Sequence, residues 1–276
     1  MSNDHNITDL INYSGFPFQT KVAEIIRNIG KSSGLSVTSE EHHWKNNDSQ
    51  EEGFIDIVAS NYAEVLRFVI ECKRKDETWF FLLPSNYKRK NTNRLLWGAK
   101  KNTKKAIDYA NFITSDGLYE TNQCIMQSKN GKLNVLFEKI CSDLLASVEM
   151  LSNQDLQVEI QERKYRVYFP LIVTTAKLVS VEYDNNTLDI ITGKFPEPIS
   201  GEQIKEVPII KFRKSFSTTI EYLHKVDSLE QAYHYSQRTV FVVNSAYIKE
   251  FFDLLNSFSL FVDYSGEPPW KLFYEM

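Results

Sequence analysis

The sequence has few cysteines, and their spacing fits no common disulfide or metal-binding pattern. The three cysteines of the 276-residue chain are Cys72, Cys124 and Cys141, an odd number at wide intervals. A disulfide framework and a zinc site built on CxxC pairs are therefore not indicated. Neither GxGxxG nor GxxxxGK[ST] occurs, so the sequence gives no sign of a nucleotide-driven motor. We expect a reducing, cytoplasmic setting.

Long hydrophobic runs are also missing. No apolar stretch approaches the roughly 20 residues that a membrane-spanning helix needs, and the start, MSNDHNITDL, lacks the basic and apolar regions of a signal peptide. With 42% hydrophobic and 25% charged residues, the composition is that of an ordinary globular protein. We expect no membrane partner. There is no repeat, low-complexity tract or obvious interdomain linker, so we expect a single domain.

The net charge of −4 argues against a protein wrapped in nucleic acid, but it hides a local asymmetry. Eleven lysines and arginines lie between Lys73 and Lys105 against only Asp76 and Glu77, so the rest of the chain carries −13. A basic segment on an acidic body is typical of a local phosphate-binding face. A solvated, lysine-rich surface is the alternative.

Hydrophobic periodicity predicts a mixed order of elements. The expected helices span 15–35, 94–113, 132–151 and 245–258, the last one capped by Ser245. The expected strands span 35–44, 54–60, 65–75, 165–183, 187–193, 207–214 and 238–244. Residues 1–11 read as a polar leader, and 78–84 could be a strand or an apolar loop. This order predicts an α/β domain with a central mixed sheet flanked by helices.

The stretch GFIDIVASNYAEVLRFVIECKRK, residues 53–75, places charged residues in two otherwise apolar strands. Alternation puts Glu71 and Lys73 on one face of the second strand and Cys72 on the other. If the short NYAE segment makes a hairpin, Asp56 of the first strand lies close to Glu71. Unpaired charge is costly in a buried strand, which calls for an explanation.

A metal site for phosphodiester cleavage would explain these charges. Asp56, Glu71 and the backbone carbonyl of Cys72 would give Mg²⁺ the oxygen ligands that it prefers, with Mn²⁺ as a substitute. Lys73 would orient or deprotonate the attacking water and offset negative charge. The alternative is an edge strand whose charges face water. A second acid-x-lysine triplet, at 162–164, lies in a polar run without an acid-bearing strand before it.

The order of a helix, a strand, a strand with Asp56 and a strand ending in Glu71-Cys72-Lys73 resembles the PD-(D/E)xK, or restriction-endonuclease-like, nuclease superfamily. The segments GFPFQTKVAEIIRNIG, FIDIVA and FVIECK are most similar to its Mrr-type and archaeal-resolvase-like branch. The similarity covers residues 13–75, and the strand FPLIVTTA fits such a core. The resemblance implies a restriction-endonuclease-like core and divalent-metal-dependent hydrolysis of DNA, with Asp56, Glu71 and Lys73 as catalytic residues.

Two departures from this pattern concern the metal site. Ile55 precedes Asp56 where the superfamily name has a proline, and Gln19 stands where the branch often has a glutamate in the first helix. Glutamine can hold a metal-bound water or a phosphate, but it brings no charge. Glu24 could replace that glutamate only if the helix is rotated or shifted, so the number of metal ions stays open.

The resemblance divides the chain into core motifs at 13–75, a basic helical insertion at about 76–130, and remaining core elements at 131–276. DNA phosphates are expected to contact the basic residues that follow the catalytic strand. The interspersed aromatic residues Trp79, Tyr87 and Trp97 would either stack on exposed bases or pack within the protein. These basic residues are Lys75, Lys88, Arg89, Lys90, Arg94, Lys100, Lys101, Lys104 and Lys105.

The expected function is a Mg²⁺-dependent deoxyribonuclease in restriction, anti-phage defence or DNA repair. Cleavage of a duplex favours a homodimer, and an activator or partner protein is compatible with the sequence. One alternative is a nuclease fold that has lost catalysis and serves as a DNA-binding or assembly subunit. Another is an enzyme that uses the same chemistry on RNA or branched junctions.

Overall fold

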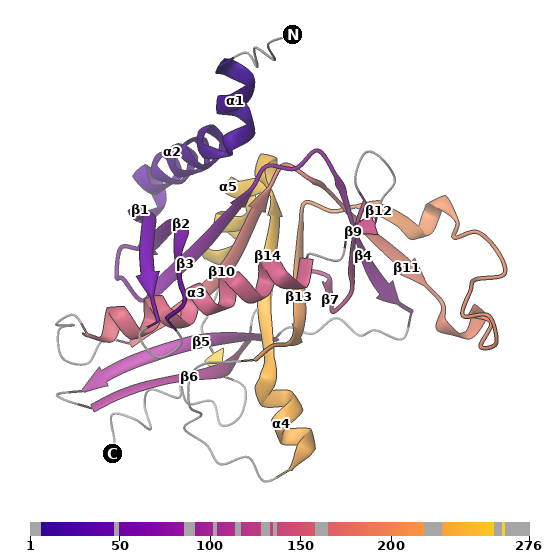
Figure 1. The fold of residues 1–276 in the computed structure, drawn as a ribbon. Helices are drawn as coiled ribbons and strands as arrows, with labels where there is room; N and C mark the ends of the chain where they lie inside the picture. Colours follow the sequence, from indigo (N-terminus) through magenta and orange to yellow (C-terminus); the bar gives the residue numbers. More distant parts are fainter. Residues whose placement is uncertain are drawn as a thin grey trace.

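The computed structural model describes residues 7–46, 50–85, 92–101, 104–113, 117–127, 133–134, 137–157, 165–217, 228–256 and 261–262. Within these ranges the chain is a mixed α/β protein with five α-helices and two β-sheets (Figure 1). The helices are α1 Ile7–Ser14, α2 Phe16–Ser33, α3 Phe137–Gln157, α4 Leu229–Ser236 and α5 Ile248–Asn256.

The large sheet combines an antiparallel meander near the N-terminus with strands from the second half of the chain. The strands are β1 Leu35–Lys45, β2 Glu52–Asn61, β3 Leu66–Lys73, β4 Thr78–Pro84, β5 Thr92–Lys101, β6 Lys104–Ile113, β7 Glu120–Thr121, β8 Cys124–Gln127, β9 Leu133–Asn134, β10 Tyr165–Thr174, β11 Lys177–Tyr183, β12 Ile204–Glu206, β13 Ile209–Ser215, β14 Gln237–Asn244 and β15 Phe261–Val262.

The large sheet has the order β1-β2-β3-β10-β14-β13-β7. β1, β2 and β3 are antiparallel, as the short NYAE connection predicts, whereas β3, β10 and β14 are parallel. Besides β3, β10 pairs with two other strands: Tyr165–Tyr168 pair with β5, and Leu171–Thr174 pair with β14. The sheet therefore branches along β10. The mixed central sheet expected from the sequence is therefore present.

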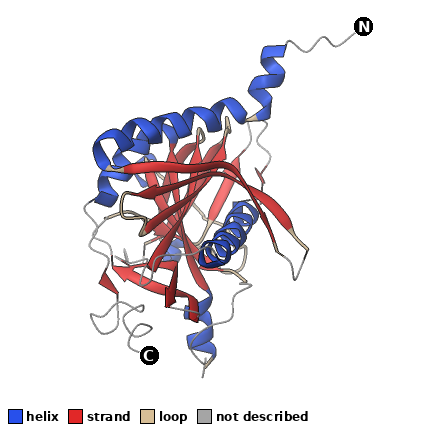
Figure 2. Ribbon diagram, turned by 90° about the vertical axis from the view of Figure 1, so that its left-hand side faces the viewer, coloured by secondary structure: helices blue, strands red, loops and turns tan. Residues whose placement is uncertain are grey.

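Helices cover both faces of this sheet (Figure 2). The apolar side of α2, with Val22, Ala23 and Ile26, packs with α5 on one face. On the other face α3 contributes residues such as Leu144 and Val148. β3 and β10 are buried on both sides, which accounts for their nearly continuous apolar sequences.

The second sheet, with order β12-β11-β4-β8-β9, continues directly from the first. β3 leads into β4 and β10 leads into β11, so the parallel pair β3/β10 becomes the parallel pair β4/β11. The break between β3 and β4, from Lys73 to Thr78, lies at the same level as the break between β10 and β11, from Thr174 to Lys177. This shared break, which we call the crease, lies at the carboxyl end of β3 (Figure 1).

The predicted helix at 94–113 is wrong, because this basic segment forms the antiparallel β5–β6 hairpin. The periodicity of Leu95, Ala99 and Ala106 suggested one apolar helix face. Leu96 and Trp97 are buried as well, on opposite sides of β5, and the pairing of β5 with β10 favours a strand. Tertiary pairing overrides local helical preference here.

Smaller differences concern chain segments at the surface. The expected polar leader contains the start of α1 at Ile7, and the helix expected at 132–151 runs from Phe137 to Gln157. The strand expected at 187–193 is an exposed turn region. The side chain of Asn244, not Ser245, caps the C-terminal helical segment by accepting a hydrogen bond from the Ala246 N–H. Residues 78–84 form β4.

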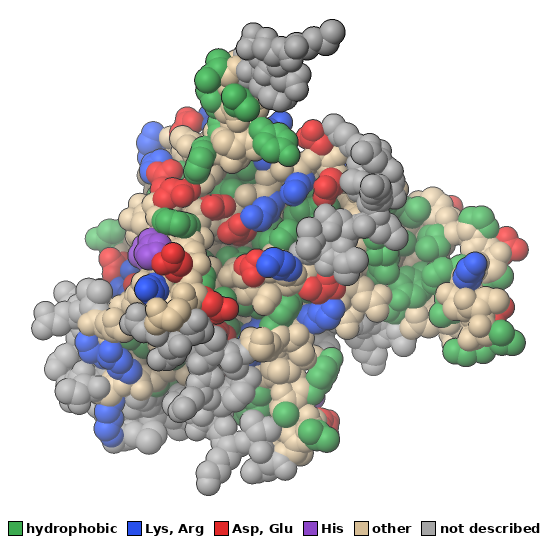
Figure 3. All heavy atoms as spheres, viewed as in Figure 1, with side chains coloured by type: hydrophobic (Ala, Val, Ile, Leu, Met, Phe, Trp, Pro, Cys, Tyr) green, Lys and Arg blue, Asp and Glu red, His purple; other side chains and the backbone are tan. Residues whose placement is uncertain are grey.

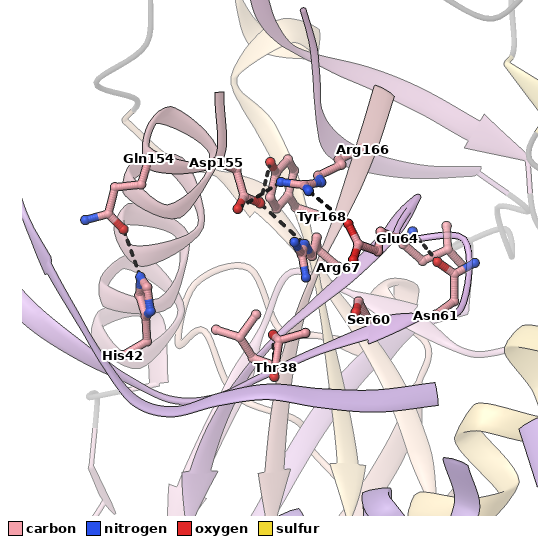
Figure 4. Close-up of polar contacts among 12 residues, drawn as sticks. Thr38, His42, Ser60, Asn61, Glu64, Arg67, Gln154, Asp155, Arg166 and Tyr168 are labelled. Carbon is pink, nitrogen blue, oxygen red and sulfur yellow. Dashed lines mark hydrogen bonds and ion pairs between the residues drawn. The ribbon is translucent and has the colours of Figure 1, made fainter. Parts of the chain in front are cut away.

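A buried ionic network fixes α3 to the beginning of β3 and β10 (Figure 4). Asp155 of α3 contacts Arg166 at 2.9 Å and Arg67 at 3.4 Å, and it accepts a hydrogen bond of 3.1 Å from the Tyr168 hydroxyl. One residue earlier, Gln154 bonds to the His42 ring of β1. These contacts set the position of α3 over the sheet.

Asp155→Ala is expected to lower the free energy of unfolding by about 3–5 kcal/mol, because it removes the carboxylate that pairs with buried Arg67 and leaves buried Arg166 with only the half-exposed Glu64 at 3.3 Å. Urea denaturation at pH 7 measures this change. Asp143→Ala is the matched control on the same helix, since Asp143 is exposed and is expected to contribute less than about 0.5 kcal/mol. Equal losses in both variants would contradict a structural role for the network.

Candidate metal and nuclease site

The β2–β3 hairpin brings Asp56 and Glu71 together. Ile57 pairs with Ile70 and Val58 with Val69, and one further step of this register sets Asp56 opposite Glu71. The Asp56 carboxylate accepts a 2.7 Å hydrogen bond from the backbone N–H of Cys72. The proximity expected from the sequence thus follows from antiparallel pairing and is fixed by a backbone hydrogen bond.

Glu71 and Lys73 lie on the face of β3 that α3 covers. Val69 belongs to the apolar cluster on the α3 side and Ile70 to the cluster on the α2 side, so alternation places Glu71 and Lys73 toward α3. Their side chains form an ion pair and remain partly accessible, 22% for Glu71 and 31% for Lys73. On the opposite side Cys72 packs against the core, and burial raises the pKa of its thiol, which argues against a nucleophilic role.

The Asp56 carboxyl has a pKa raised from 3.8 to about 7. Burial is the largest cause and the negative charge of Glu71 the second, while the Cys72 N–H and Lys73 act in the opposite direction. For Lys73, burial lowers the pKa of the ammonium, but the charge and hydrogen bond of Glu71 outweigh it and the pKa is raised. The cluster therefore combines two repelling carboxylates with a firmly protonated lysine.

Of the two α2 residues considered for the site, only Gln19 reaches it. Its buried side-chain amide donates a 2.9 Å hydrogen bond to the backbone carbonyl of Asp56. Glu24 lies on the exposed side of α2 and pairs with Lys21 at 2.8 Å. Gln19 thus supports the strand that carries Asp56, and the structure does not bring Glu24 to the cluster.

Sequence reasoning missed a third carboxylate, Glu41 of β1. The β1–β2 register pairs Glu40 with Ile57 and His42 with Ile55, so Glu41 stands opposite Asp56. Its negative charge contributes to the raised pKa of Asp56, and its backbone has a φ of 50°. Because Glu41, Asp56 and Glu71 lie on three adjacent strands, strand register would have been needed to find this alignment.

A cavity of about 610 Å³ opens beside Glu71, between the β1–β2 ends and α3. Trp44 and Phe54 form part of its wall, and its carboxylate side chains are Glu51, Glu52, Glu71, Asp143 and Glu149. Such a concentration of negative charge favours cations and disfavours bare phosphate. Figure 3 shows acidic and basic side chains interspersed on the face of the molecule that it draws.

The donor chemistry of the cluster fits a sparsely coordinated divalent cation. Asp56 and Glu71 supply two carboxylates, and Mg²⁺ is commonly held by one or two carboxylates while it keeps several waters. A bound cation would also relieve the repulsion that raises the pKa of Asp56. Among the described residues no group of three or more His, Cys, Asp or Glu is arranged to hold a metal, so water or substrate must complete the coordination.

The residues expected to bind DNA are dispersed. Lys75 lies within the crease, whereas Lys88, Arg89 and Lys90 fall outside the described residues. Arg94 is only 6% exposed and lies over the Tyr235 ring, so it is not placed for surface contact with a backbone.

The remaining lysines occupy the end of the β5–β6 hairpin, where Lys100 pairs with Lys105 and Lys101 with Lys104. Figure 3 shows basic side chains at the lower left, where Figure 1 draws this hairpin end. By register, Lys100 lies beyond Tyr165, about eight residues or ~26 Å along β10 from the level of Glu71. The hairpin and the carboxylate cluster therefore cannot contact the same phosphate.

Comparison with known proteins finds no family model, curated protein or solved structure that matches the chain. Within the described residues, no helix has the length and apolar character needed to cross a membrane.

The raised pKa of Asp56 predicts a pH-dependent effect of Asp56→Asn in metal-free protein. The folded state prefers the protonated carboxyl, so the stability of the wild type is lost as pH rises from about 4 through about 7. Asparagine avoids this loss, and Asp56→Asn is expected to stabilise the fold by on the order of 2–4 kcal/mol at pH 8 relative to its effect at pH 4. Urea denaturation with EDTA at both pH values measures it, with Asp253→Asn on α5 as the exposed control. An equal change in the free energy of unfolding at pH 4 and pH 8 would contradict a raised pKa for Asp56.

Proposed function

We propose that the chain is a divalent-metal-dependent deoxyribonuclease that hydrolyses DNA phosphodiester bonds. The observation that supports this most strongly is the clustering of Asp56, Glu71 and Lys73 at the carboxyl end of β3, with Asp56 tied to the Cys72 N–H and Lys73 to Glu71. Partly buried, mutually repelling carboxylates are costly for stability, and perturbed groups of this kind gather at functional sites.

The fold is consistent with this proposal. An antiparallel β1–β2–β3 meander follows α2, which is the order of elements on which the resemblance to the restriction-endonuclease-like superfamily rests. β10, which contains FPLIVT, joins β3 in parallel after α3 and fits such a core, and a core of that type is part of the proposal.

Each residue of the cluster has a distinct role in the proposed reaction. Asp56 and Glu71 would hold the cation, Mg²⁺ or Mn²⁺, which would supply a Lewis acid for the phosphate and lower the pKa of a coordinated water. Lys73 remains protonated next to Glu71, so it orients the attacking water and offsets negative charge developing on the phosphate. Gln19 holds the backbone of Asp56 in place through its carbonyl.

DNA is proposed to bind through phosphate contacts at Lys75 and at the β5–β6 hairpin end. Cleavage of both strands of a duplex would require a homodimer or a partner chain. We place the activity in the cytoplasm, in restriction, anti-phage defence or DNA repair.

A non-catalytic DNA-binding or assembly subunit is the second candidate. The sparse donor set favours it, because Glu24 does not reach the cluster and Gln19 donates to the backbone there. The survival of costly buried charge at Asp56 favours catalysis.

Lys73→Ala is expected to lower kcat at least about 100-fold in Mg²⁺-dependent cleavage of plasmid and single-stranded DNA, because positioned proton-transfer and charge-stabilising groups contribute factors of this size. EDTA should abolish wild-type cleavage. Lys249→Ala is the control, since Lys249 is exposed on α5 and pairs only locally with Asp253 at 3.0 Å. Metal-dependent cutting that survives in Lys73→Ala would exclude the proposed role.

The double variant Lys104→Ala/Lys105→Ala is expected to weaken DNA binding equally for all sequences. It should reduce the slope of log K against log salt by about 2, since each lost phosphate contact contributes roughly 0.9. Fluorescence anisotropy in EDTA, at several salt concentrations, gives the slope. Lys205→Ala/Lys249→Ala removes the same charge from exposed ion pairs elsewhere. If both variants change the slope equally, the hairpin is not a DNA contact.

A further inference from the structure

We propose that Thr174 is a positioning residue for Lys73, fixing the end of the catalytic strand at the crease between the two sheets. The inference rests on the proposed function and adds to it a residue on another strand, 101 positions further along the chain.

The contact is a direct hydrogen bond to the backbone of Lys73. β10 pairs with β3 so that Thr174 stands opposite Lys73, and the Thr174 hydroxyl donates a 2.8 Å hydrogen bond to the Lys73 carbonyl. The Thr175 N–H lies 3.3 Å from the same oxygen. Thr174 is fully buried, so water cannot replace its hydroxyl.

Thr175 makes a similar contact to Lys75, two residues past Lys73 in the connection between β3 and β4. Its hydroxyl accepts a 2.8 Å hydrogen bond from the Lys75 N–H and donates one of 3.0 Å to the Lys75 carbonyl. Thr174 at the end of β10 and Thr175 just after it therefore hold Lys73 and Lys75, alternate residues where the chain leaves β3. They do so at the level where both strands turn into the second sheet.

A chain of hydrogen bonds connects Thr174 to the beginning of the C-terminal helical segment. The Thr174 hydroxyl oxygen accepts from the Ala176 N–H at 3.0 Å, and the Ala176 carbonyl accepts from the Asn244 side-chain amide at 2.9 Å. Asn244 in turn accepts from the Ala246 N–H at 3.0 Å. Hydrogen bonds thus connect the backbone of Lys73 in β3 to β10, to β14 and to the beginning of the C-terminal helical segment.

Fixing the backbone matters because a lysine side chain has many rotamers, and Glu71 restrains only its tip. A displacement of about 1 Å in a reacting group can cost about 100-fold in rate. Loss of the Thr174 hydroxyl would leave the Lys73 carbonyl with only the 3.3 Å hydrogen bond from the Thr175 N–H, while Glu71 and Lys73 themselves stay unchanged.

The test compares Thr174→Val, Thr174→Ser and Thr239→Val in Mg²⁺-dependent cleavage by the full chain. Valine keeps the shape of threonine and removes the hydroxyl, while serine keeps the hydroxyl. Thr239 is the matched control: it is fully buried in β14 and its hydroxyl accepts a 2.9 Å hydrogen bond from the Arg94 N–H. Tm values by differential scanning calorimetry report the general structural cost of each change.

Thr174→Val is expected to lower kcat about 10- to 100-fold with KM within about twofold, and Thr174→Ser to restore kcat. Thr239→Val should lower Tm to a similar extent and leave kcat within about twofold. Equal kcat losses in the two valine variants, or no rescue by serine, would overturn the positioning role. Absence of cleavage by the wild type would instead remove the proposed function on which the inference rests.

Discussion

The hydrogen bond from the Cys72 N–H to the Asp56 carboxylate is the interaction on which the candidate site depends. It locks the antiparallel register of β2 and β3 at the point where their acids meet, and that register sets Asp56 opposite Glu71. Gln19 holds the same residue from α2, and Thr174 holds Lys73 from β10. The site is thus assembled from backbone contacts among four elements, while its charged side chains remain available for a ligand.

The balance between acidic and basic side chains differs between the two ends of β3 and β10. At the beginning of β3 and β10, Asp155 and Glu64 balance the charges of Arg67 and Arg166 in a network that fastens α3. At the carboxyl end, burial and the negative charge of Glu71 raise the pKa of Asp56 to about 7 despite the opposing effects of the Cys72 N–H and Lys73. The first arrangement stabilises the fold, and the second is costly without a cation. This contrast is what one expects if the carboxyl end of β3 is functional.

The sequence was sufficient to predict the local structure of the site but not its surroundings. Two apolar strands joined by NYAE predict a hairpin, and alternation alone separates Glu71 and Lys73 from Cys72. The basic segment at 94–113 was misread, because alternating burial on both faces of β5 depends on pairing with β10. Glu41 and Thr174 reach the site through strand register with β2 and β3, and long-range pairing of this kind leaves no mark in either segment alone.

Calorimetric titration of the wild type and of Asp56→Asn with Mn²⁺ at pH 7, in two buffers of different ionisation enthalpy, tests the central claim most directly. Because burial and Glu71 raise the pKa of Asp56 to about 7, some of its carboxyls hold a proton near pH 7, and cation binding should release protons from the wild type. The account predicts one bound cation with proton release, and loss of both binding strength and proton release in Asp56→Asn. Absence of binding by the wild type, or identical titrations of the two proteins, would contradict a metal site at Asp56 and Glu71.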